Sequence, residues 1–182
     1  MKKILKIGIK LFFSLVSLGL TFLLIAAVFF GVKGYQMYQD AVHKTPLHEK
    51  VETIRNTEGF TKYEELPEIY VEAVVSVEDK RFWSHHGVDY LAIGRALWND
   101  IRAMSFVEGG STISQQLMKN EYFTQEKKLE RKFAEVFAAW ELEREYGKKE
   151  IFELYVNTIY FGSGYYGIHD AAEGYFGKGP SQ

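Results

Sequence analysis

The feature that most constrains this chain is a long uncharged stretch near its N-terminus, residues 11–32, which covers 22 positions. At about 1.5 Å of rise per residue, a helix of that length matches a hydrocarbon core of roughly 30 Å. A basic tail, residues 1–10, precedes it with four lysines and no acid, so the positive-inside rule predicts a cytoplasmic N-terminus. The alternative is a cleaved signal peptide, whose apolar region usually covers only about 7–15 residues. An uncleaved transmembrane anchor over residues 11–32 is the favoured interpretation.

The remainder of the chain is acidic. Beyond residue 32 it carries 18 basic and 24 acidic residues, a formal charge of −6. Nucleic acid is therefore not an expected partner, because domains that bind it carry an excess of basic residues on one face. The absence of cysteine excludes a disulfide framework, a thiolate zinc site and a cysteine nucleophile. Any basic binding site must be a local cluster.

The chain after the anchor divides into two parts. Residues 33–60 are polar and mixed in charge, which indicates a stalk, and residues 61–182 have the composition of one folded domain. In the domain, apolar residues recur at spacings of three and four, and alternating strand patterns are scarce. The sequence therefore predicts a mostly α fold.

Glu78 is the first candidate for chemistry. It falls on the same helical stripe as Val71, Val75 and Phe82, so its carboxylate is expected to face the core or a cleft wall. Apolar neighbours can poise an acid for proton transfer, as a general base or acid requires. The alternative is an ion pair with Arg81 or another cation at the end of the stripe.

A second candidate region begins with two glycines, residues 109–110, before the sequence Thr112-x-x-Gln115. That sequence is typical of a capping box, so a loop is expected to open into a helix whose free N–H groups attract anions. Gln115 and Lys119 lie four residues apart on one face and offer amide and ammonium donors together. The alternative is an ordinary capped helix with no ligand.

The third candidate region is a helix predicted over residues 129–142, which is apolar on two sides and is therefore packed on two sides. The stripe containing Phe133 is expected to face the core. Glu135 lies on the opposite side with Arg131 and Lys132 one turn above it, and is expected to line an interior cleft where the two cations could meet a phosphate. The alternative is an exposed Arg131–Glu135 pair, worth only about 0.3–0.5 kcal/mol.

These segments resemble, in order, the motifs of the family 51 glycosyltransferases, the peptidoglycan polymerases that occur alone or as the N-terminal half of bifunctional penicillin-binding proteins. The pattern Glu-Asp-x-x-Phe-x-x-His-x-Gly is matched at 78–87, the Gly-Gly-Ser-Thr motif at 109–120 and Arg-Lys-x-x-Glu at 131–135. A fourth and a fifth motif are matched at 149–157 and 171–178. Five ordered motifs make the resemblance specific.

The resemblance implies a lysozyme-like, mostly helical head with a small membrane-proximal jaw lobe near residues 98–125, preceded by the transmembrane helix. Apolar jaw side chains would enter the membrane interface, where a lipid-linked substrate keeps its tail. They are Trp98, Ile101, Met104, Phe106, Tyr122 and Phe123. A small core formed by these side chains is the alternative, and the two interpretations are compatible.

The resemblance also implies a reaction: polymerisation of lipid II into β-1,4-linked glycan strands, with inversion and release of a lipid pyrophosphate. Glu78 would be the general base for the acceptor 4-hydroxyl, and Glu135 would position the pyrophosphate-binding cations or a divalent metal ion. Magnesium or manganese is the expected cofactor, although no metal-ligand spacing is visible. The residues implied in substrate binding are Asp79, Phe82, His85, Ser111, Thr112, Gln115, Gln116, Lys119, Asn120, Lys127, Arg131 and Lys132.

The expected setting is the bacterial cytoplasmic membrane, with the N-terminus inside and the catalytic domain on the extracytoplasmic face. Expected partners are lipid II, the growing glycan chain, the membrane and proteins of cell-wall synthesis or division. The sequence stops directly after the fifth motif, where family members usually continue through further helices, so the domain is expected to be truncated. Lys127 stands where many relatives carry arginine, which keeps the charge but loses the bidentate fork.

Two alternative functions stay open. A glycan-cleaving enzyme could use a cleft glutamate as its general acid, but a neutral sugar leaving group has no need of Lys119, Arg131 and Lys132. A non-catalytic scaffold that binds the lipid-linked precursor or division proteins is the second alternative. Intact Glu78 and Glu135 argue against a scaffold, whereas truncation argues for it.

Overall fold

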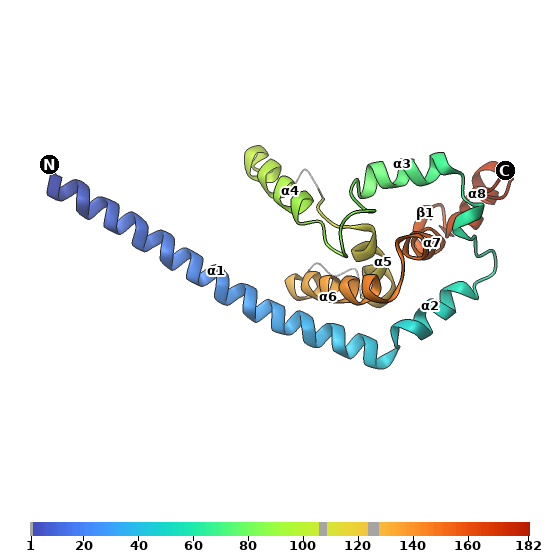
Figure 1. Cartoon of the computed structure of the whole chain (residues 1–182), viewed down its shortest axis with the longest axis horizontal. Coiled ribbons are helices and arrows are strands. Elements are labelled where there is room, and N and C mark those ends of the chain that lie inside the picture. Colours follow the sequence, from blue (N-terminus) through green and yellow to red (C-terminus); the bar gives the residue numbers. More distant parts are fainter. Residues whose placement is uncertain (1, 106–108, 124–127) are drawn as a thin grey trace.

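A computed structural model describes residues 2–105, 109–123 and 128–182, with side chains from residue 6 onward. Its first helix, α1 (Lys2–Lys44), is a single 43-residue helix, and Figure 1 shows it extending far from the other helices at its N-terminal end. The apolar side chains of its uncharged part are mostly exposed. By length and composition this helix can cross a membrane, which agrees with the predicted anchor.

The segment expected to be a stalk, residues 33–60, is instead part of the folded domain. Helix α1 continues to Lys44, and α2 (Leu47–Arg55) follows directly after Pro46. Leu47, Val51 and Ile54 of α2 are buried in the core. The charges that indicated a stalk lie on the outer faces of these helices, a pattern that composition alone does not separate from a linker.

The core lies among three helices in the second half of the chain: α5 (Ile113–Tyr122), α6 (Leu129–Glu145) and α7 (Lys148–Thr158). They contribute the fully buried side chains Ile113, Leu117, Leu142, Ile151, Phe152, Leu154 and Val156. Helix α3 (Glu68–Glu78) adds Val71 and Val75 to this core, and the short 3₁₀ turn before it, η1 (Tyr63–Glu65), packs Tyr63 against it. The predicted mostly α fold is confirmed.

Helix α6 is packed on two sides, as predicted, but the two sides are exchanged. The face with Ala134, Glu135 and Ala138 is buried, whereas Phe133 is only partly buried. Phe133 faces α1, because a Cβ added at Gly34 would lie 2.4 Å from the Phe133 Cβ. The larger apolar side chains of α6 therefore contact the continuation of the anchor, and its small residues allow close packing in the core.

Helix α4 (Tyr90–Ala103) lies apart from the core helices in Figure 1. Trp98, Ile101 and Met104 are 66%, 63% and 92% exposed, which fits the expected jaw lobe. Tyr122 and Phe123 differ from that expectation, because they pack partly buried against the core. Phe106 lies outside the described residues.

A short antiparallel hairpin, β1 (Tyr160–Gly162) and β2 (Tyr165–Tyr166), follows α7 and is followed by α8 (Ile168–Phe176).

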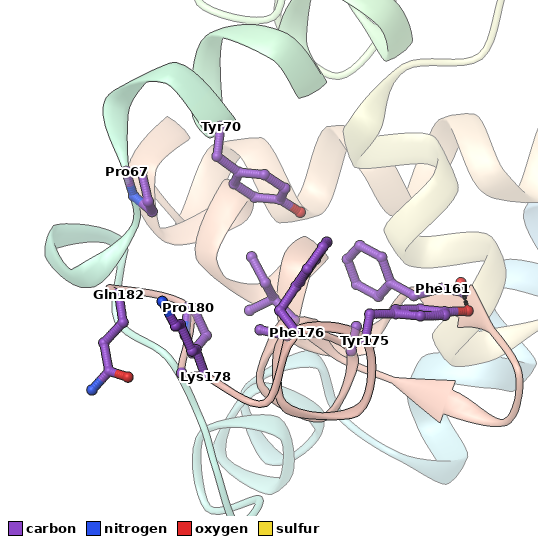
Figure 2. A pocket seen from close by; sticks show the side chains of 12 residues that line it. Pro67, Tyr70, Phe161, Tyr175, Phe176, Lys178, Pro180 and Gln182 are labelled. Carbon is purple, nitrogen blue, oxygen red and sulfur yellow. Dashed lines mark hydrogen bonds between the residues drawn. The ribbon is translucent and has the colours of Figure 1, made fainter.

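Beside α8 is a largely apolar hollow of about 500 Å³ (Figure 2). The Tyr70 hydroxyl is buried without a partner among the described residues, and burial raises the pKa of Tyr70 to about 12. The side chains that line this hollow include no Asp, Glu or His.

Candidate active site

Glu78 is the last residue of α3, and its side chain is exposed. It lines a cleft of about 270 Å³ together with Asp79 and Ser111, and its Oε2 accepts a hydrogen bond of 3.0 Å from Nε2 of Gln116. The structure therefore places Glu78 at a cleft wall and not against the core. The apolar stripe misleads because the helix ends at this residue: Phe82 reaches the core from the turns that follow.

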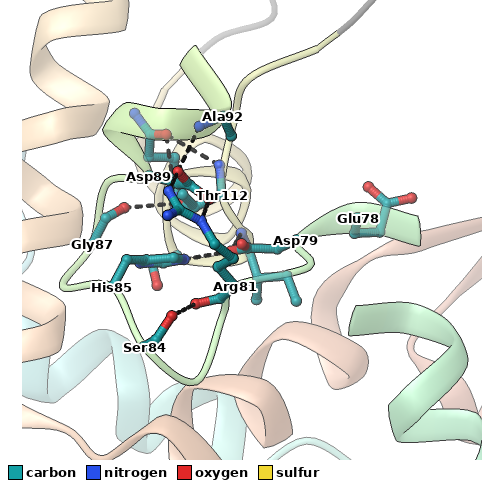
Figure 3. A network of polar contacts seen from close by, with 12 residues as sticks. Glu78, Asp79, Arg81, Ser84, His85, Gly87, Asp89, Ala92 and Thr112 are labelled. Carbon is teal, nitrogen blue, oxygen red and sulfur yellow. Dashed lines mark hydrogen bonds and ion pairs between the residues drawn. The ribbon is translucent and has the colours of Figure 1, made fainter. Parts of the chain in front are cut away.

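Asp79, the next residue, is the buried carboxylate of this motif. It is 6% exposed, and its Oδ2 lies 2.8 Å from Nε2 of His85 and 3.0 Å from the backbone nitrogen of Ile113. Ile113 is the first residue of α5. Asp79 therefore fastens the end of α3 to the start of α5, and Figure 3 shows Glu78 pointing away from this network.

Arg81 does not pair with Glu78, as one interpretation of the sequence expected. Its guanidinium binds both carboxylate oxygens of Asp89, and Asp89 also caps α4 by accepting a 2.6 Å hydrogen bond from Ala92 N. The Arg81 guanidinium holds the pKa of Asp89 below its usual range. This pair closes the loop between α3 and α4 and lines the same cleft.

The predicted capping box is present at the start of α5. The Thr112 hydroxyl accepts a hydrogen bond from Gln115 N, and Gln115 Oε1 accepts one from Thr112 N, both at 3.1 Å. The Thr112 hydroxyl also donates to the Gly87 carbonyl at 2.6 Å. Gln115 is 1% exposed and does not line the cleft. For this residue the ordinary capping interpretation holds.

Glu135 is 1% exposed, and both of its oxygens are bonded by cations. Arg131 NH1 donates to Oε1, and Lys132 Nζ donates to Oε2 at 2.7 Å. Lys132 also donates to Ser111 Oγ at 2.7 Å. The Arg131–Glu135 ion pair of the alternative interpretation is present, but its carboxylate is buried and not exposed. The two cations lie on the solvent side of Glu135, with side chains 13% and 46% exposed.

Of the predicted site residues, Glu78, Asp79, Ser111 and Thr112 line the cleft, whereas Arg131, Lys132 and Glu135 are connected to it through Ser111. Lys119 is half-buried and Asn120 is exposed, both in the second half of α5, and neither lines the cleft of Glu78. Lys127 lies outside the described residues.

Tyr155 is a member of the site that the sequence did not single out. Its hydroxyl lies 3.3 Å from Oε1 of Gln116, the residue whose amide nitrogen donates to Glu78. Burial, with the charge of Glu78 as a smaller contribution, raises the pKa of Tyr155. A tyrosine at a core position of a helix gives no local signal that its hydroxyl reaches a catalytic candidate.

The described residues hold no group of three or more His, Cys, Asp or Glu side chains arranged for a metal ion. Two carboxylates of the candidate site already form ion pairs: Glu135 pairs with Arg131 and Lys132, and Asp89 pairs with Arg81. These donors therefore do not fit a resident metal held by protein ligands alone. The predicted magnesium or manganese stays a prediction.

Comparison with known proteins adds independent findings. A family model described as transglycosylase matches residues 45–182. Penicillin-binding protein 1F of Bacillus subtilis is 51% identical over 114 residues, covering 63% of this chain and 16% of the relative. Penicillin-binding protein 1A of Aquifex aeolicus is 49% identical over 119 residues, covering 65% and 16%.

A monofunctional glycosyltransferase of Staphylococcus haemolyticus is 38% identical over 160 residues, covering 88% of this chain and 57% of the relative. The chain therefore spans a little over half of that protein and a small part of the penicillin-binding proteins. The region matched by the family model, residues 45–182, includes every described residue of the candidate site.

Proposed function

The chain belongs to the transglycosylase family, and on this premise we propose that it polymerises lipid II into β-1,4-linked glycan strands. The observation that carries the proposal is the position of Glu78. An exposed carboxylate at a cleft wall is joined, through the Ser111 wall and Lys132, to a pair of cations over buried Glu135. The transfer needs a base and an anion site near each other, and here Glu78 lines the cleft while Lys132 is bonded to Ser111 in the wall of that cleft.

In the proposed reaction, the 4-hydroxyl oxygen of the acceptor attacks the anomeric carbon of the growing chain. Glu78 takes the hydroxyl proton, the bond from the anomeric carbon to the pyrophosphate oxygen breaks, and its electron pair leaves with the lipid pyrophosphate. The Gln116 amide holds one Glu78 oxygen at 3.0 Å. A carboxylate has about four lone-pair sites, so this bond leaves capacity to accept a proton.

Arg131 and Lys132 would stabilise the charge that develops on the pyrophosphate, because donors fixed before the reaction need no reorganisation during it. Glu135 holds both cations in place from below. A divalent ion, if used, would take most of its ligands from phosphate oxygens and water, as Mg²⁺ commonly does.

The anchor supports a membrane setting. Gly34, against which Phe133 of α6 packs, comes two residues after the uncharged stretch ends. The cations of α6 would therefore stand close to the surface of the bilayer, where a lipid pyrophosphate is found. We further propose that the N-terminus is cytoplasmic and the domain extracytoplasmic, as the four N-terminal lysines favour. Partners among cell-wall synthesis or division proteins stay a prediction.

Glycan cleavage fits the site less well. The general acid of a glycosidase is kept protonated by burial against apolar groups, and Glu78 is exposed. Product analysis distinguishes polymerisation from cleavage. The detergent-solubilised protein is incubated with labelled lipid II and, separately, with preformed glycan strands. The proposal expects longer strands and released lipid pyrophosphate from lipid II, and unchanged preformed strands. Shortened strands without polymer would instead favour the lytic alternative.

A further inference from the structure

A buried ion pair lies beneath the candidate site. Lys148, the first residue of α7, places Nζ 2.6 Å from Oε1 of Glu143 near the end of α6. The two side chains are 19% and 4% exposed, and the ammonium also lies 4.5 Å from the centroid of the Phe82 ring. Burial lowers the pKa of Lys148, an effect that the Glu143 carboxylate opposes. Each charge therefore depends on the other, since an unpaired ion would be disfavoured here.

Two sets of polar contacts lead from the Glu143–Lys148 ion pair toward the cleft. The Ser114 hydroxyl of α5 donates to the same Glu143 oxygen at 2.5 Å. Nδ1 of His85 lies 3.9 Å from that oxygen, and Nε2 of the same ring lies 2.8 Å from Asp79. The imidazole is 7% exposed. The separation of 3.9 Å is too long for a hydrogen bond, and His85 Nδ1 has no hydrogen-bond partner among the described residues. The hydrogen-bonded route from the ion pair is therefore the one through Ser114.

Both sets of contacts meet in the first turn of α5. Within four residues, the backbone nitrogen of Ile113 is bound by Asp79, Ser114 by Glu143, and Gln116 binds Glu78. The turn that orients the proposed base is therefore held from two directions. Neither Ser114 nor Glu143 lines the cleft, so their effect on chemistry must act through this turn.

We infer that Glu143 and Lys148 are positioning residues that set Gln116, and through it Glu78, by fixing the first turn of α5. The inference rests on the proposed function. Replacing a buried ion pair by apolar residues of similar size is often neutral or stabilising. A pair that serves stability alone could therefore be exchanged without effect, whereas one that orients neighbouring groups could not.

The test is the double variant Glu143→Leu/Lys148→Met, compared with wild type for melting temperature, kcat and KM with lipid II. The expected result is a melting temperature close to wild type, an unchanged KM and a kcat lower by about 10- to 100-fold, the scale of a small misplacement of reacting groups. Wild-type kcat in a stable double variant would overturn the inference. Arg55→Met, which removes a more exposed pair with Glu150, should leave kcat unchanged.

If the double variant does not fold, the single variant Ser114→Ala tests whether the contact of Glu143 with α5 affects kcat. It removes only the hydrogen bond between α5 and Glu143, and alanine is favourable in a helix. A several-fold lower kcat with unchanged KM and melting temperature is expected, and the exposed Ser76→Ala should match wild type. Wild-type kcat for Ser114→Ala would overturn the inference. If wild-type protein formed no polymer at all, the proposed function would be the part that failed.

Discussion

Lys132 donates a hydrogen bond of 2.7 Å from Nζ to Oγ of Ser111, which joins the loop before α5 to the first turn of α6. The same ammonium lies 2.7 Å from Oε2 of buried Glu135. One cation therefore connects the cleft wall to the carboxylate that holds it in place. A phosphate at the cleft would meet a charge that is already oriented, which is the condition for strong electrostatic stabilisation.

Replacing Lys132 by Met should lower kcat on the order of 10²- to 10³-fold, the usual effect of removing one preorganised charge-stabilising donor. The fold should persist, because the Lys132 side chain is 46% exposed and Glu135 keeps Arg131. Polymerisation rates measured beside Lys149→Met, an exposed lysine of α7, check the prediction. Equal rates for both variants would contradict it.

Replacing Glu135 by Gln should lower both stability and activity. The change leaves Arg131 and Lys132 adjacent without the carboxylate between them, and removing one partner of a buried pair typically costs about 3–5 kcal/mol. Partial exposure of Lys132 places the expected loss at the low end, about 3 kcal/mol. Urea unfolding in detergent measures it, and an unchanged midpoint would show that the pair contributes no stability.

Gly34→Leu should destabilise the contact between the anchor helix and α6. An added Cβ would lie 2.4 Å from Phe133 Cβ and 2.7 Å from the Glu130 carbonyl, and such overpacking typically costs about 1–3 kcal/mol. Gly19→Leu is the matched control, because a Cβ at that position meets nothing within 4 Å. The melting temperature should fall for Gly34→Leu alone. Equal values would mean that α1 and α6 are not closely packed.

The Arg81–Asp89 pair should make stability depend on pH. Because the folded-state pKa of Asp89 is lowered by Arg81, its contribution is complete above the unfolded-state pKa of about 3.9. It is lost as the pH falls through the folded value. The difference in unfolding free energy between wild type and Asp89→Asn should be constant from about pH 7 to 5 and shrink toward about pH 3. A difference that grows on acidification would reverse the assigned sign.

The parts of the site that sequence predicts well are local. The partners in the Thr112–Gln115 capping box are three residues apart, so the local sequence is enough to predict their hydrogen bonds. The small residues on the Glu135 face of its helix likewise predict an interior position, although Glu135 is buried and does not line the cleft of Glu78, whereas the sequence predicts a cleft wall. Both predictions needed no knowledge of the rest of the chain.

The parts that sequence could not predict depend on distant partners. The apolar stripe through Glu78 continues in the sequence past the point where α3 ends, and that end coincides with the contacts of Asp79 to His85 and α5. Both sides of α6 are apolar, so only the packing of α1 at Gly34 decides which side faces the core. Arg81 could have paired with Glu78 at helical spacing, but the turn after α3 brings it to Asp89.

The central claim is that Glu78 is the base in glycan polymerisation. The most direct test compares kcat for Glu78→Gln and for Glu72→Gln, an exposed glutamate of the same helix, with lipid II binding measured in parallel. The account predicts that Glu78→Gln binds lipid II but loses at least about 10²-fold in kcat, the scale of general-base catalysis, while Glu72→Gln stays near wild type. Polymer formed by Glu78→Gln at the wild-type rate would contradict the account.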